Sequence, residues 1–237
     1  MTTSPFLGEL IGTMVLVLLG NGVVANVVLN KTKGNNGGLI AITTGWAFAV
    51  TIGIFVSQKF GSAAAHLNPA VTIAMAVKDN DYSNVLPFIL AQMLGAIIGA
   101  TLVWLQYLPH WGATEDKGTK LAAFSTSPAI ANTTANLISE IIGTLILLIG
   151  VIALYSESGS GMSPILVGFL VWGIGLSLGG PTGYAINPAR DLGPRIAHAI
   201  LPIAGKGSSD WGYAWIPVVG PIVAAVIAGA IMNGFGF

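Results

Sequence analysis

The sequence contains no cysteine and very little charge. Its 237 residues include 9 Lys and Arg against 9 Asp and Glu, so charged residues make up 8% of the chain, against about 25% in an ordinary soluble domain. Without cysteine there can be no disulfide bond, thiolate nucleophile or cysteine-ligated metal site. The scattered basic residues leave no basic stripe for a phosphate backbone, so nucleic-acid binding is not expected. With three His and few carboxylates, no enzyme, metal site or cofactor is expected either.

Apolar residues dominate what the sequence does contain. Hydrophobic residues make up 54% of the chain, and its mean hydropathy is +0.80. A soluble protein of this length hydrates its exterior with ionic and polar side chains, whereas here the few charges stand mostly in connectors between long apolar runs. So high an apolar content also excludes a disordered chain. The composition therefore predicts a multi-pass protein embedded in the lipid bilayer.

Six apolar stretches are long enough to cross a bilayer as helices. They are residues 6–29, 39–57, 85–109, 137–155, 162–181 and 211–237. The first is expected to stay in the mature protein, because no Lys or Arg precedes it and its apolar part is longer than that of a signal peptide. The longest connector, residues 110–136, carries several charges with Thr, Ser and Gly, and is expected to form an exposed loop.

Two further segments place polar residues among apolar ones. Residues 60–77 contain His66 and Asn68, and residues 183–201 contain Asn187, Arg190 and Asp191. Backbone that is not helical survives at membrane depth only where it is buried in protein or lines a watery cavity. We therefore expect each segment to be a re-entrant loop followed by a half-helix.

Two short patterns occur twice, in the same order. Glu-x-x-Gly-Thr begins at Glu9 and again at Glu140, and Asn-Pro-Ala begins at Asn68 and again at Asn187. Three spans and one re-entrant segment per half make an odd number of crossings, so the second half enters from the opposite side of the membrane. The prediction is an all-α polytopic membrane protein with six transmembrane helices and two re-entrant half-helices. Its single domain, residues 1–237, consists of two inverted-repeat halves, 1–118 and 119–237.

The Asn-Pro-Ala motif has a physical reason at the start of a helix. Asn is a strong N-cap, Pro suits the first helical position, and Ala permits close approach. Once its oxygen is used in capping, the side-chain NH2 of Asn remains free to donate, beside the positive end of the half-helix. Two such caps that meet in the membrane suit oxygen lone pairs and repel cations. The residues concerned are Asn68, Pro69, Ala70, Asn187, Pro188 and Ala189.

With these motifs the sequence resembles the major intrinsic protein family, the aquaporins and glycerol facilitators. The resemblance covers essentially the whole chain. It rests on both Glu-x-x-Gly-Thr patterns, on the run Ala-His-Leu-Asn-Pro-Ala-Val-Thr from Ala65 and on the run Gly-Tyr-Ala-Ile-Asn-Pro-Ala-Arg-Asp from Gly183. It implies a multi-pass channel of the plasma membrane, assembled as a homotetramer, in which each monomer conducts small uncharged solutes and excludes ions and protons.

The resemblance also implies a selectivity filter at the narrowest point of the pore. The family takes one filter residue each from the second span, the fifth span and the loop before the second Asn-Pro-Ala motif, and the fourth is the Arg three residues after the Asn of that motif. Here these positions are Trp46, Gly175, Tyr184 and Arg190, with Phe48 as the alternative to Trp46. Trp46 is otherwise interpreted as an anchor at the lipid interface, and Gly175 as a helix-contact residue in a Gly-x-x-x-Gly pattern with Gly179.

Three residues in or next to the filter indicate which solutes the pore admits. Gly175 stands where water-selective members carry His, and so implies a wide filter of the aquaglyceroporin branch. Asp191, directly after Arg190, is typical of the same branch. Tyr184 stands where Phe is commoner, and its hydroxyl has two interpretations: a donor in the pore that favours small carbonyl-bearing solutes, or a group turned back to a backbone carbonyl. The expected solutes are glycerol and similar polyols, with dihydroxyacetone or urea as further candidates, together with water.

Buried polar groups complete the expected pore. The backbone carbonyls of Ala64, Ala65 and His66 are expected to line it. Glu9 and Glu140 have two interpretations, as carboxylates that support the re-entrant loops or as a proton relay; their duplication favours the supporting role.

Orientation and function leave alternatives open. The distribution of Lys places the N-terminus outside by the positive-inside rule, whereas the family places both termini inside. The lysines of the odd-numbered connectors are Lys31, Lys33, Lys117, Lys120 and Lys206, against Lys59 and Lys78 in the even-numbered ones. The alternatives in function are a mainly water-conducting aquaporin and, more distantly, an ion-coupled secondary transporter, which would need ion-binding or proton-relay residues at the midplane.

Overall fold

The computed structural model describes residues 3–157 and 161–236. Within these ranges all regular secondary structure is helical, as the sequence predicts. The helices are α1 (Pro5–Val28), α2 (Gly38–Lys59), α3 (Pro69–Asp79), α4 (Val85–Gln106), α5 (Leu108–Ala113), α6 (Lys117–Ala122), α7 (Thr133–Glu157), α8 (Ser163–Leu178), α9 (Pro188–Ile200) and α10 (Ile216–Phe235).

The long helices correspond to the six apolar stretches. Among the described residues, α1, α2, α4, α7 and α10 are long and apolar enough to cross a membrane. The helix α8 is equally apolar but has 16 residues, which is about 24 Å at 1.5 Å per residue. The helix α10 begins at Ile216, later than the stretch from residue 211 predicts, because residues 211–215 form turns.

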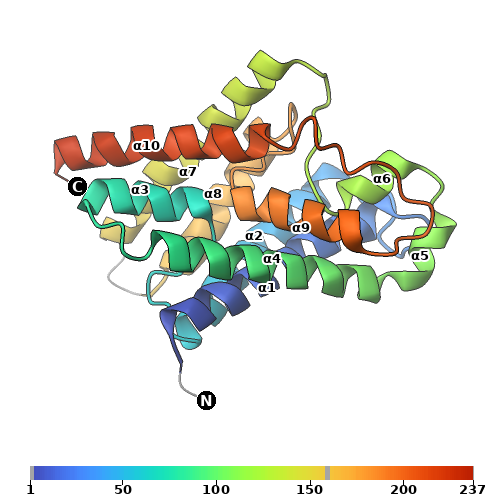
Figure 1. Cartoon of the computed structure of the whole chain (residues 1–237), viewed down its shortest axis with the longest axis horizontal. Helices are drawn as coiled ribbons and strands as arrows, with labels where there is room; N and C mark the ends of the chain where they lie inside the picture. Colours follow the sequence, from blue (N-terminus) through green and yellow to red (C-terminus); the bar gives the residue numbers. More distant parts are fainter. Residues whose placement is uncertain (1–2, 158–160, 237) are drawn as a thin grey trace.

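The two predicted half-helices are α3 and α9, and each follows a loop without regular structure. In Figure 1 they lie roughly in line, between α10 on one side and α4 on the other. Each begins at its Asn-Pro-Ala motif, with Asn as N-cap and Pro at the first turn. Oδ1 of Asn68 accepts from the backbone N–H of Ala70 at 2.8 Å, and Oδ1 of Asn187 accepts from that of Ala189 at 3.0 Å.

Close helix packing holds the half-helices in place. The helix α4 approaches α1 at two glycines: a Cβ atom on Gly95 would collide with the carbonyl oxygen of Leu10, and one on Gly99 would lie 2.5 Å from that of Met14. Small residues at such crossings let backbones approach closely, as in other membrane helices. The same helix α4 also contacts α9, while α10 contacts both α3 and α9.

The long connector differs from its prediction. Residues 110–136 were expected to be an exposed loop, but they contain α5, α6 and the start of α7, and several of their side chains are buried. Trp111 and Phe124 pack with ring centroids 5.4 Å apart, and Lys120 is only 3% exposed. Its ammonium group donates to the carbonyl oxygen of Ala204 at 2.5 Å. The expectation was wrong because buried backbone carbonyls take the place of water around this charge.

Candidate functional site

A buried carboxylate supports the loop before α3. Oε1 of Glu9 accepts from the Ser62 hydroxyl at 2.7 Å and from the backbone N–H of His66 at 2.8 Å. Oε2 accepts from the backbone N–H of Leu67 at 2.7 Å and from Nε2 of Gln92 at 2.8 Å. Glu9 is fully buried, so these bonds replace the water that a carboxylate would otherwise bind.

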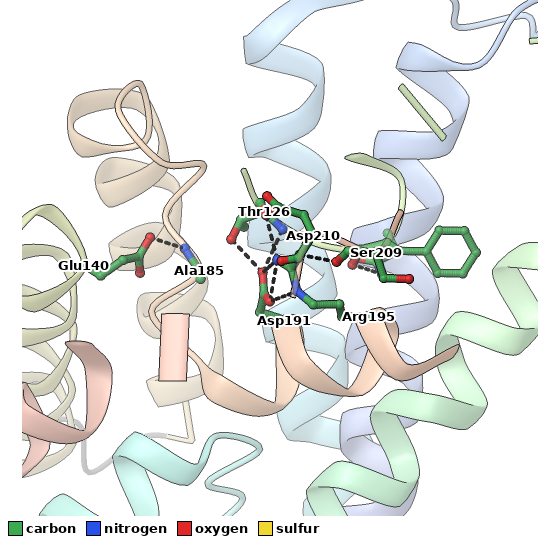
Figure 2. A network of polar contacts seen from close by, with 9 residues as sticks. Thr126, Glu140, Ala185, Asp191, Arg195, Ser209 and Asp210 are labelled. Atoms are coloured by element: carbon green, nitrogen blue, oxygen red, sulfur yellow. Dashed lines mark hydrogen bonds and ion pairs between the residues drawn. The ribbon is translucent and has the colours of Figure 1, made fainter. Parts of the chain in front are cut away.

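The loop before α9 has a matching arrangement. Glu140, also fully buried, accepts from the Thr182 hydroxyl at 2.6 Å and from the backbone N–H groups of Ala185 at 3.1 Å and Ile186 at 2.9 Å. Figure 2 shows the carboxylate of Glu140 directed at Ala185. In both halves the carboxylate therefore bonds a hydroxyl and the two N–H groups just before Asn. These are the contacts that the supporting role requires.

The supported loops have an unusual backbone. Ala65, Leu67, Tyr184 and Ile186 all have φ between 41° and 52°, a region that residues with a side chain rarely adopt. Each such residue costs about 1–3 kcal/mol and persists only where its surroundings over-determine it. The glutamate bonds to the neighbouring N–H groups supply that constraint.

Each Asn-Pro-Ala motif is bonded to the residue that precedes the other motif. Nδ2 of Asn68 donates to the carbonyl oxygen of Ile186 at 2.8 Å, and Nδ2 of Asn187 donates to that of Leu67 at 2.8 Å. The sequence predicts a free amide group on each Asn. The structure corrects this, because one N–H of each amide joins the two halves and one N–H remains.

A cavity of about 530 Å³ runs past this junction. Its wall has two chemically different parts. One part is polar and consists of Asn68, Asn187, Arg190 and the two supported loops, including Ala64, Ala65 and His66. The other part is apolar and comes from α1, α2, α7 and α8, with Leu16, Val50, Ile54, Leu147, Val151, Val167 and Val171.

Three of the predicted filter residues lie together on this cavity. Cζ of Arg190 lies 4.2 Å from the ring centroid of Trp46, and both residues line the cavity with Tyr184. Among the described residues the guanidinium group has no hydrogen-bond partner, so its donors are free for a solute. Phe48 is 61% exposed on the outside of α2. The structure therefore brings Trp46, and not Phe48, to Arg190.

Gly175 is the predicted filter residue that does not line the cavity. A Cβ atom on it would lie 2.9 Å from Cζ of Tyr184 and 2.9 Å from Cγ2 of Thr43. The space that glycine leaves is therefore filled by the Tyr184 ring.

The hydroxyl of Tyr184 also differs from its expected place. It is buried and has no hydrogen-bond partner within the part of the chain that the structure describes, and it lies 3.1 Å from where a Cβ atom on Gly175 would be. It therefore faces α8. The sequence suggests that this hydroxyl donates to carbonyl-bearing solutes, but in the structure it does not face the cavity.

A buried ion pair on α9 is a feature that the sequence did not reveal in full. Arg195 and Asp191 are 2.8 Å apart and completely buried. Thr126 donates to Asp191 from its backbone N–H at 2.7 Å and from its hydroxyl at 2.6 Å, and Arg195 donates to the carbonyl oxygens of Thr126, Ser209 and Asp210 (Figure 2). The spacing of Asp191 and Arg195 on one helix face was visible, but their loop partners were not. The network ties two distant loops to the helix that carries Arg190.

Comparisons with known proteins agree with this geometry. The family model of the major intrinsic proteins matches residues 2–232. A protein of Thermotoga maritima described as a probable glycerol uptake facilitator is 54% identical over 232 residues, covering 97% of this chain and 98% of its own. A glycerol uptake facilitator of Streptococcus pneumoniae is 56% identical over 230 residues, covering 96% and 97%.

A solved structure agrees as well. The X-ray structure of the aquaglyceroporin from Plasmodium falciparum superposes with a TM-score of 0.83 at 33% identity, covering 96% of this chain and 94% of that one. The resemblance seen in the sequence is thereby confirmed, as is an all-helical membrane fold. The chain belongs to the major intrinsic protein family.

Proposed function

We propose that this protein is a passive membrane channel for glycerol and similar small uncharged polyols, together with water, and that it is not an enzyme. The observation that carries the proposal is the two-sided wall of the cavity. A polyol has carbon atoms along one side and hydroxyl groups along the other. The apolar side chains of α1, α2, α7 and α8 suit the carbon atoms, while Asn68, Asn187, Arg190 and the loop backbone suit the hydroxyl groups.

The charges along the cavity support the exclusion of ions and protons. Among the described residues that line it, no side chain is acidic, whereas Lys78 and Arg190 are basic. The N-terminal ends of α3 and α9 meet at the bonded Asn pair and add positive dipole ends. Glu9 and Glu140 lie behind the loops with their oxygens bonded to backbone, so in this proposal they support the loops and do not relay protons.

The proposed filter consists of Trp46, Tyr184 and Arg190, with Gly175 behind Tyr184. In this proposal the Trp46 and Tyr184 rings pack against the carbon chain, and Arg190 donates to its oxygens. The backbone carbonyls of Ala64, Ala65 and His66 accept from the hydroxyl groups of the solute in the part of the cavity next to Asn68.

The equivalent bonds of Glu9 and Glu140 support the division into inverted halves at residues 1–118 and 119–237.

The proposal includes six spans plus two half-helices, with α8 as the short span, in the plasma membrane. It also includes a homotetramer. The exposed isoleucines of α7 suit an apolar neighbour, which is lipid or another subunit: Ile138, Ile142, Ile146 and Ile149 are 45–52% exposed.

Stopped-flow light scattering on proteoliposomes tests the function. Gradients of glycerol, urea and sorbitol are imposed in turn, with protein-free liposomes as the control. The proposal predicts rapid entry of glycerol and exclusion of the bulkier sorbitol. Water flow without glycerol entry would indicate a water channel, and saturable uptake that depends on an ion gradient would indicate a transporter.

A further inference from the structure

The ring of Tyr184 lies along one face of α8, between Gly179 and Gly175. A Cβ atom on Gly179 would lie 2.5 Å from Cδ1 of the ring and 3.0 Å from Cε1, and one on Gly175 would lie 2.9 Å from Cζ and 3.1 Å from Oη. Carbon atoms in optimal contact are about 3.5–4.0 Å apart. The ring therefore occupies space that a side chain at either position would need.

A methyl group from α2 approaches the same point of α8 as the hydroxyl end of the ring. Thr43 is fully buried, and its Cγ2 would lie 2.9 Å from the same Cβ atom on Gly175 that meets Cζ of Tyr184. The Thr43 hydroxyl donates to the carbonyl oxygen of Ile40 at 3.2 Å. Since the hydroxyl bonds within α2, the methyl group is the part of Thr43 that meets α8.

The base of the ring is held by the loop that carries it. The backbone N–H of Gly183 donates to the carbonyl oxygen of Gly179 at 2.9 Å, and Glu140 fixes Ala185 and Ile186 on the other side of Tyr184. With Gly175 and Gly179 of the α8 segment behind the ring, the direction left open is the cavity that Tyr184 lines. Any volume added behind the ring therefore pushes it toward Trp46 and Arg190.

We infer that Thr43 and Gly179 are positioning residues of the filter. Neither lines the cavity, yet together with Gly175 they fix the Tyr184 ring from behind and set how wide a carbon chain can pass. The inference rests on the proposed function and names two residues that determine its selectivity. One methylene group in an apolar site discriminates between substrates by about 10- to 200-fold, so a small displacement of the ring has a measurable effect.

Alanine at the two glycines tests the inference. Gly175→Ala and Gly179→Ala are reconstituted as full-length protein, and the permeabilities to glycerol and to water are measured on the same vesicles. The ratio of glycerol to water permeability is expected to fall about tenfold in both variants. Gly173→Ala is the matched control on the same helix, because a Cβ atom there meets nothing within 4 Å. Its ratio is expected to equal that of the parent.

A suppressor variant separates ring displacement from damage to the helix. A Cβ atom on Gly179 also lies 2.5 Å from the carbonyl oxygen of Gly175, so distortion of α8 is a competing explanation for that variant alone. Thr43→Ser removes Cγ2, which would lie 2.9 Å from a Cβ atom at residue 175, so the added methyl group can move away from the ring. Added to Gly175→Ala, it is expected to restore most of the lost glycerol permeability.

The outcomes distinguish this inference from the function on which it rests. A parental ratio in both glycine variants, or a fall in Gly175→Ala that Thr43→Ser does not reverse, overturns the inference and leaves the channel intact. A parent protein that does not admit glycerol refutes the proposed function itself.

Discussion

In the proposed filter, Arg190 both attracts a solute and excludes ions. Its guanidinium group stacks on Trp46 with Cζ 4.2 Å from the ring centroid and faces the cavity with its donors free. Two like charges 4 Å apart repel by about 4 kcal/mol at an effective dielectric constant of 20. A cation that passes this point therefore meets a high barrier, whereas a neutral hydroxyl group meets a hydrogen-bond donor.

Replacing this residue should make the pore leak. Arg190→Ala removes the positive charge, and we expect cation or proton currents across planar bilayers that the parent does not show. Arg190→Lys keeps the charge but loses the planar stack on Trp46, so it should remain tight to cations. A variant Arg190→Ala as tight as the parent would show that the Asn pair and the half-helices suffice for exclusion.

Tyr184 offers a second test at this scale. Its hydroxyl is buried against α8 and has no hydrogen-bond partner among the described residues, so we expect it to take no part in choosing solutes. Tyr184→Phe is therefore expected to leave the dihydroxyacetone-to-glycerol permeability ratio unchanged in swelling assays. A ratio that falls in Tyr184→Phe would mean that the hydroxyl turns into the cavity during permeation.

At the scale of the element, α9 is held by the buried Asp191–Arg195 pair. Removing one partner of such a pair leaves an uncompensated buried charge, which costs about 3–5 kcal/mol. Arg195→Met is therefore expected to destabilise the protein by about that amount, measured by thermal unfolding in detergent.

The control is Asp79→Ala, which breaks the exposed Lys78–Asp79 pair, whose side chains are 22% and 56% exposed. It should cost at most about 1 kcal/mol, and equal losses in the two variants would contradict this account of the network.

The half-helices show which features of the fold can be predicted from the sequence. Asn-Pro-Ala has a local cause, since capping by Asn and the fixed φ of Pro act within one turn, and α3 and α9 begin where the motifs predict. The partners of Asp191 are not local: Thr126 lies on another connector and Ser209 on a third. Likewise, the sequence predicts Gly175 as a filter residue. That Tyr184 and Thr43 lie next to Gly175 depends on how α2 and the Tyr184 loop pack on α8, which the sequence does not show. The sequence predicts an exposed loop over residues 110–136 because charged side chains are usually exposed, whereas the buried Lys120 donates to the carbonyl oxygen of Ala204.

At the scale of the whole molecule, the two halves make one pathway. Each half contributes a supported loop, a capped half-helix and an Asn whose amide bonds the opposite loop. In the proposed mechanism the pathway takes up no proton at the junction of the halves, because Glu9 and Glu140 are bonded to backbone N–H groups and do not line the cavity. Its transport should therefore follow the solute gradient alone.

The most direct test of this account measures glycerol entry and proton flux in the same proteoliposomes, with a pH-sensitive dye inside. We expect glycerol entry that rises linearly with its gradient, is unaffected by an imposed pH or sodium gradient, and is accompanied by no more proton flux than in protein-free vesicles. Glycerol entry that saturates and is driven by either ion gradient, or proton flux that rises with the amount of protein, would contradict the passive-channel mechanism.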